Sequence, residues 1–255
     1  MKRMFILLFV STFTNLFCQN SDFQKAKDEF EKFIFSSDST KIQNIRTQKF
    51  ENIIEFEDRN NHLITRKIDF DLSESIYKMR FSYSFEKRYT KTREVKIHIF
   101  YFLGKEIGKI IDYDQYKDEL KQVSSKFEPN FQKFIEKHNS FYKTKFSVEK
   151  FIDDSILNTV YGNYCGYSGE KYQKRYDVEL ENLKNAEKYV DWMKSFNLEK
   201  QMWGYDQIQY LLKNNLIELE PKEEKIFNHI RERNAIIEMC SGCEFGIYDK
   251  AFNNK

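Results

Sequence analysis

The sequence predicts an α+β fold, in which an N-terminal helix packs on an antiparallel β-meander of about five strands, followed by an all-helical C-terminal half. Apolar residues recur at helical spacing in Ser21–Phe35, alternate with polar residues between Phe50 and Tyr113, and return to helical spacing from Asp114 onward. The chain has only 8 Gly and 2 Pro, and this shortage of turn residues favours long regular elements. We expect three parts: a signal peptide over 1–18, helix plus sheet over 19–115, and a helical region over 116–255.

The first expected helix, Ser21–Phe35, carries its apolar side chains on one face, with charged residues between them. Those apolar residues are Phe23, Ala26, Phe30, Phe33 and Ile34. The polar run Ser36–Ser39 then ends the helix.

The following region alternates with a period of two, as half-buried strands do. The alternation is clearest in Tyr77–Phe85, where aromatic residues and a methionine occupy every second position. Asp58–Asn61 has the composition of a hairpin turn, and Gly104 and Gly108 bracket a tight return. The other expected strands are Phe50–Phe56, Leu63–Phe70, Val95–Tyr101 and Ile107–Tyr113.

Helical spacing resumes after Tyr113 and continues toward the C-terminus. Ser147 and Asp177 are each placed to cap a helix, and Pro221 fits the first turn of another. The expected helices are Leu120–Ile135 with a break at Pro129, one after Ser147, one after Asp177, Tyr205–Leu212, and Pro221–Cys240.

The first eighteen residues have the pattern of a secretory signal peptide. Lys2 and Arg3 are basic, Met4–Phe17 is mostly apolar, and Cys18 precedes the expected cleavage point before Gln19. The apolar run is shorter than the roughly 20 residues that a membrane-spanning helix needs, so we expect no transmembrane segment in the mature chain. The protein is therefore expected to be exported, to a bacterial periplasm or outside the cell. The alternative is that Cys18 becomes the lipid-modified first residue of a bacterial lipoprotein.

The charge of the mature chain argues against a nucleic-acid partner. Cleavage after Cys18 removes Lys2 and Arg3, which leaves 40 basic residues against 40 acidic ones. A protein that binds nucleic acid needs a basic excess to displace phosphate counterions. We therefore expect a protein or a cell-surface component as the partner.

Three cysteines remain after processing, namely Cys165, Cys240 and Cys243. In an oxidising compartment an odd number allows at most one intramolecular bridge. Cys165 can pair with either later cysteine, or Cys240 can pair with Cys243 in a CxxC segment. Both alternatives stay open from the sequence.

Three of the eight glycines lie in the segment Tyr161–Gly169, where glycine allows close approach of the backbone to an ion. This segment resembles the calcium-binding loop of secreted phospholipases A2, with its tyrosine-glycine start and its cysteine-glycine pair. The resemblance implies that the carbonyl groups of Tyr164, Gly166 and Ser168 would face calcium.

The catalytic part of that family's pattern is missing. The family uses an adjacent His-Asp pair on the helix after the loop, whereas Val178–Phe196 has no histidine. Without an imidazole the stretch lacks a general base suited to neutral pH. We therefore interpret the segment mainly as a connection pinned by a disulfide at Cys165, and keep an exported hydrolase with a degenerate calcium loop as the alternative.

Other candidate groups give no catalytic pattern. The four histidines are scattered without the i, i+4 spacing of a zinc helix, so surface roles are expected for His62, His98, His138 and His229. Asp153 and Asp154 are adjacent and so point in different directions on a helix; they are interpreted as solvated residues or as partners of the helix dipole. We expect no catalytic residue and no cofactor, with calcium as the alternative. The sequence thus favours an exported, non-catalytic binding or interaction protein.

Overall fold

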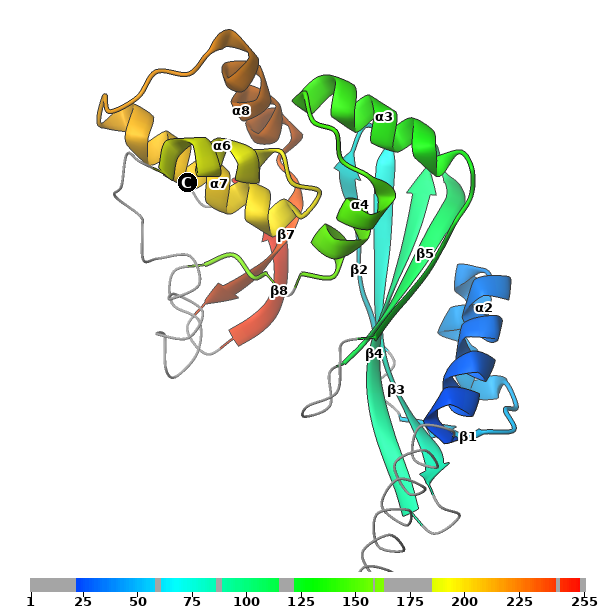
Figure 1. Ribbon diagram of the computed structural model, residues 1–255. Coiled ribbons are helices and arrows are strands. Elements are labelled where there is room, and N and C mark those ends of the chain that lie inside the picture. Colours follow the sequence, from blue (N-terminus) through cyan, green and yellow to red (C-terminus); the bar gives the residue numbers. More distant parts are fainter. Residues whose placement is uncertain are drawn as a thin grey trace, which may run out of the picture. The chain divides into compact units, whose positions relative to one another are not determined.

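The computed structural model shows a mixed α+β fold (Figure 1). The described residues form two compact units. The first unit comprises the described residues up to Thr65, Ser75–Phe100 and Glu106–Glu128; the second comprises Arg66–Glu74, Tyr101–Lys105 and the chain from Pro129. The described residues are 22–57, 61–85, 89–114, 122–157, 159–162, 185–241 and 244–252.

The first unit begins with the expected amphipathic helix, over residues 22–36. Phe23, Ala26, Phe30 and Ile34 are all buried, and the Phe30 ring stacks on Phe81 of the sheet at 5.0 Å between centroids. Two short turns of helix follow, α2 (Ser39–Gln43) and η1 (Ile45–Thr47). Burial of this one apolar face accounts for the helix, as its periodicity predicts.

The sheet has six strands, with β1 antiparallel to β3 and β5 antiparallel to β6, and it confirms the predicted α+β class (Figure 1). The order is β1-β3-β4-β5-β6, and β2 also pairs with β3. The bounds are β1 (Ile53–Phe56), β2 (Asn61–Asp69), β3 (Leu72–Phe85), β4 (Tyr89–Phe102), β5 (Lys105–Tyr113) and β6 (Gln122–Phe127).

One strand lies where the sequence indicates helix. Gln122–Phe127 forms β6, paired with β5 from Gly108↔Phe127 to Tyr113↔Gln122. The apolar residues Val123 and Phe127 are four apart, a spacing that suits a helix as well as a strand end. Pairing with the exposed edge of β5 decides between the two, and such pairing is not visible in local periodicity.

The second unit is mainly helical, as the sequence predicts. Its helices are α3 (Phe131–Tyr142), α4 (Val148–Ser155), α6 (Ala186–Met193), α7 (Leu198–Lys213) and α8 (Pro221–Arg233). Ser147 caps α4 as expected, by accepting the Lys150 N–H, and Pro221 lies at the start of α8. The predicted cap Asp177 lies outside the described residues. In the described part of the chain, no helix has the length and apolar character to cross a membrane.

The last helix is shorter than the predicted helix Pro221–Cys240. α8 ends at Arg233, where Asn234 takes the left-handed conformation with φ 43°, a common helix stop. The chain then forms β7 (Ile236–Ser241), which pairs antiparallel with β8 (Glu244–Lys250). The β-branched pair at the start of β7 favours this strand, but the partner that stabilises it comes only from later sequence.

Candidate ligand pocket

Two tight turns of the second unit form part of one pocket. Phe70 and Asp71 connect β2 to β3, and both have positive φ, 43° and 69°. Leu103 and Gly104 connect β4 to β5 with φ of 51° and 77°. The Leu103 N–H donates to the Asp71 carbonyl at 3.2 Å, which ties the turns together. Such two-residue turns usually hold Gly or Asn, so a phenylalanine there is a strained choice.

A buried carboxylate, Asp69, precedes the first turn and is held by three hydrogen-bond donors and one ion pair. His229 Nε2 lies 2.8 Å from Oδ1, the Tyr142 hydroxyl 2.6 Å from Oδ2, and the Arg233 guanidinium 3.1 Å from Oδ2. The Phe70 N–H donates to Oδ1 at 3.0 Å. Burial alone would raise the pKa of Asp69, but the hydrogen bond from His229 and the charge of Arg233 outweigh it and lower the pKa. Asp69 is therefore ionised.

His229 is oriented by that carboxylate. Because an ionised carboxylate only accepts hydrogen bonds, Nε2 carries the proton, and the Nδ1 of a neutral ring carries the lone pair. Within the described residues Nδ1 has no hydrogen-bond partner. The ring stacks on Phe70 with 5.5 Å between centroids and 12° between planes, and contacts Phe141 on α3. The imidazole is thus fixed in position, with about a quarter of it exposed.

The pocket beside this cluster encloses about 700 Å³, within the range of small-molecule sites. Its charges balance, with three basic and three acidic side chains besides His229. Lys137 and Asp71 form a loose ion pair at 3.4 Å, and both are half exposed. The pocket is lined by Lys67, Asp69, Phe70, Asp71, Leu72, Ser73, Leu103, Gly104, Lys137, His229, Glu232 and Arg233.

A buried ion-pair group holds the same hairpin against the helices of this unit. Arg66 Nε lies 3.0 Å from Glu74 on the paired strand, and the guanidinium also contacts Glu199 of α7. Glu199 in turn accepts the Glu238 N–H of β7 at 2.8 Å. Burial alone would lower the pKa of Arg66, but the two carboxylates raise it further above its ordinary value. The hairpin that carries Asp69 is therefore fixed to α7 and β7.

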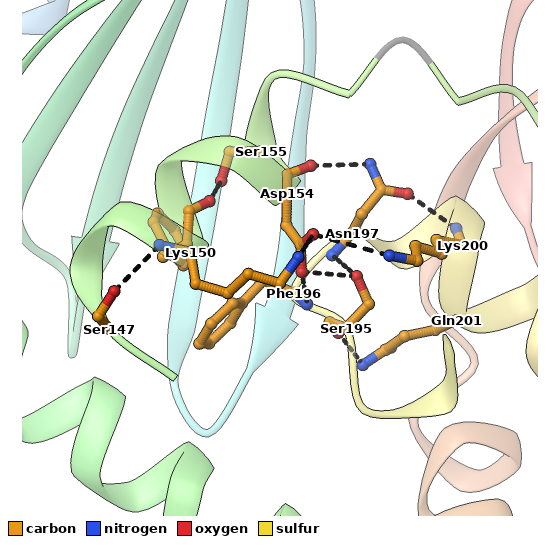
Figure 2. Close-up of polar contacts among 10 residues, drawn as sticks. Ser147, Lys150, Asp154, Ser155, Ser195, Phe196, Asn197, Lys200 and Gln201 are labelled. Atoms are coloured by element: carbon orange, nitrogen blue, oxygen red, sulfur yellow. Dashed lines mark hydrogen bonds and ion pairs between the residues drawn. The ribbon is translucent and has the colours of Figure 1, made fainter. Parts of the chain in front are cut away.

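A second carboxylate, Asp154, is buried, whereas the sequence predicts a solvated residue or a partner of the helix dipole. It is 1 % exposed and accepts hydrogen bonds from Lys150, the Ser195 hydroxyl and the Phe196 N–H at 2.7, 2.8 and 3.1 Å (Figure 2). Its carbonyl accepts from the Asn197 amide at 3.2 Å (Figure 2). Asn197 caps α7, so Asp154 holds the turn from which that helix starts. All of these bonds are internal, which gives Asp154 a structural role.

The expected cleavage site, the candidate calcium ligands and two of the three later cysteines lie outside the described residues. Of the cysteines, only Cys240 is placed in the described part; it is buried in β7, and the pairing stays a prediction. The described residues contain no group of three or more His, Cys, Asp or Glu that could hold a metal ion. The residues outside the description are Cys18, Gln19, Tyr164, Cys165, Gly166, Ser168 and Cys243.

The expectation of surface histidines is wrong for two of the four. His138 is 1 % exposed and His98 is 4 % exposed. His229 is partly exposed, but its partner Asp69 lies 160 positions earlier in the sequence. No local motif connects these two residues, so sequence reasoning missed the pocket.

Comparison of the chain with protein-family models, curated proteins and solved structures finds no match.

Proposed function

We propose that the chain is an exported, non-catalytic binding protein, and that its pocket beside Asp69 and His229 receives a group of a protein or cell-surface partner. The observation that carries the proposal is the fixed geometry of the pocket wall. Asp69 is held by three hydrogen bonds and the ion pair with Arg233 before any ligand arrives, and His229 is held by Asp69. Such preorganisation lowers the entropy cost of binding.

Binding is favoured over catalysis by what His229 contacts. In a nucleophilic hydrolase the base makes a hydrogen bond to a serine, threonine or cysteine. In the described part of the chain, the hydrogen bond of His229 goes to Asp69 alone. The pair therefore lacks the third member of a nucleophilic triad among these residues.

Filling the pocket tests its role. Ser73 lines the pocket and is partly exposed, and its hydroxyl makes no hydrogen bond to the described residues, so Ser73→Tyr should occupy the cavity without unfolding the chain. The matched control is Ser140→Tyr, on an exposed position of α3 outside the pocket. In a ligand-observed NMR screen of small polar compounds, we expect binders that Ser73→Tyr loses and Ser140→Tyr keeps. The absence of any such compound would overturn the proposed pocket function.

Export is tested separately by expressing the full chain with its own N-terminus in a bacterial host. We expect the protein outside the cytoplasm, with an intact mass that begins at Gln19. A mass that includes a diacylated Cys18 would support the lipoprotein alternative, whereas cytoplasmic protein that still begins at Met1 would refute export.

The second candidate function is an exported hydrolase, favoured by the Asp69–His229 pair. A neutral imidazole held by a carboxylate can take a proton from an attacking water. Turnover of chromogenic esters that His229→Gln abolishes would support this function. The form of this hypothesis in which the hydrolase binds calcium depends on Tyr164, Gly166 and Ser168, which are not among the described residues. It predicts calcium binding by calorimetry that a Gly166 substitution removes, and no calcium binding would reject it.

A further inference from the structure

We infer that the pocket recognises a zwitterionic ligand, one that carries an ammonium group and an acid group a few bonds apart. The inference rests on the proposed binding function and names the ligand chemistry of the same pocket. Free amino acids, peptide ends and the ethanolamine phosphodiester of a lipid headgroup all share this chemistry.

The first argument for a zwitterionic ligand comes from the charged side chains that line the pocket. Asp69 and Arg233 neutralise each other's charge. Arg233 also donates to Gln201, and its buried Nε and Nη1 have no hydrogen-bond partner among the described residues. Lys67 and Glu232 remain, and neither has an ion-pair partner among the described residues. The pocket thus offers one uncompensated charge of each sign. A ligand that enters loses hydration around its charged groups and needs opposite charges in return.

The ammonium end is assigned to α8. His229 and Glu232 are three residues apart on this helix, so they are neighbours on one face. When the His229 ring is neutral and Nε2 donates to Asp69, Nδ1 is free to accept a hydrogen bond from a ligand, and the Glu232 carboxylate supplies the negative charge. An ammonium group has three donors and can use both.

The acid end is assigned to two lysines. Lys67 is exposed on β2, and Lys137 of α3 has its ammonium 5.5 Å from the centre of the Phe70 ring. The pair between Lys137 and Asp71 is loose and half exposed, and ion pairs of that kind are weak, so a ligand can replace it. A carboxylate or phosphate would therefore meet two cations.

The test uses isothermal titration calorimetry of the full chain with probes that differ in one charge. Glycylglycine carries both charges, N-acetylglycylglycine only the acid, and glycylglycinamide only the ammonium. Glycerophosphoethanolamine carries both charges as the ammonium and phosphodiester groups of an ethanolamine lipid headgroup. We expect a zwitterion to bind at least about fivefold more tightly than either single-charge probe. The stronger of the two zwitterions identifies the source as a peptide or a lipid headgroup.

Two charge-removing variants assign the ends of the ligand. Glu232→Gln should remove the preference for glycylglycine over its N-acetyl form, and Lys67→Gln should remove the preference over the amide. The matched controls, Lys213→Gln and Glu218→Gln, remove exposed charges of the second unit outside the pocket and should change neither preference.

The outcomes separate the ligand class from the pocket function. If a single-charge probe binds as tightly as the zwitterions, or if none of these probes binds while the NMR screen finds other compounds sensitive to Ser73→Tyr, the ligand class is wrong and the pocket function stands. If the screen also finds no such compound, both are overturned.

Discussion

Replacing His138 by phenylalanine should remove the stability loss of about 2 kcal/mol that this residue causes between about pH 7 and pH 5. His138 is buried between Tyr142 and Phe196, with ring centroids 4.3 and 4.0 Å away, and neither ring nitrogen has a hydrogen-bond partner among the described residues. Burial, as the largest cause, lowers the pKa of His138 from 6.5 to about 4, and the charge of Arg233 acts in the same direction. Asp69 and Asp154 act to raise it, by less.

The size of the effect follows from that pKa difference. The unfolded chain binds a proton near its ordinary pKa of 6.5 and the folded chain only near 4. Between these values the unfolded state holds more protons, so stability is present above 6.5 and is lost as the pH falls toward 4. At about 1.4 kcal/mol per pKa unit, the full loss is about 3 kcal/mol, of which about 2 kcal/mol falls between about pH 7 and pH 5.

Urea unfolding followed by tryptophan fluorescence measures this loss. Trp192 and Trp203 are the two tryptophans of the chain, and both lie in the second unit, so the signal reports that unit. The wild-type chain and His138→Phe share every other titrating group, and therefore the difference between their pH profiles isolates His138. Phenylalanine keeps the aromatic packing without the two unpaired nitrogens, so the variant should also be about 1 kcal/mol more stable at neutral pH.

Two results would refute the reasoning. Parallel pH profiles for the wild type and the variant would show that His138 does not bind a proton on unfolding in this range. A wild-type chain that gains stability on acidification, relative to the variant, would reverse the sign and would mean that the folded chain holds a protonated His138.

Three further substitutions have expected costs in the urea midpoint of the same assay. Gly204→Ala should destabilise by about 1–3 kcal/mol although alanine favours helix by about 1 kcal/mol, because its Cβ would lie 2.6 Å from a carbonyl oxygen of α6; a stabilised variant would contradict this close packing. Asp154→Ala should cost about 3 kcal/mol by leaving buried donors unpaired, whereas its exposed neighbour Asp153→Ala should cost little; equal costs would remove the structural role of Asp154. Arg66→Met should cost about 3–5 kcal/mol because it leaves two buried carboxylates without their cation, and a loss as small as that of the exposed Arg80→Met would show that the buried group is not needed.

The fold class was predictable because each long helix or strand buries one face. The spacing of apolar residues in the sequence indicates that face. The helix over residues 22–36 and the strand β3 follow that spacing directly. The cap at Ser147 and the start of α8 at Pro221 were also predictable, because capping depends on residues within one turn of each other.

The candidate site was not predictable in the same way. Asp154 follows another aspartate on a charged stretch, and nothing nearby distinguishes it from a solvated residue. Its burial comes from the turn at Ser195–Asn197, some forty positions later. His138 lies four residues from both Phe134 and Tyr142 on the buried face of α3, whereas the ring of Phe196, which also covers it, comes from a later segment of the unit.

The sequence by itself determined most of the local structure, because helix and strand periods, caps and turns depend on residues a few positions apart. The tertiary structure alone decided that Gln122–Phe127 and Ile236–Ser241 are strands, since a strand is stabilised by a partner at a distance. It also decided that Asp69 and His229 meet in one pocket. The physical reason is that the donors to a buried carboxylate come from whichever segments the fold brings next to it. No periodicity in the nearby sequence indicates which segments those are.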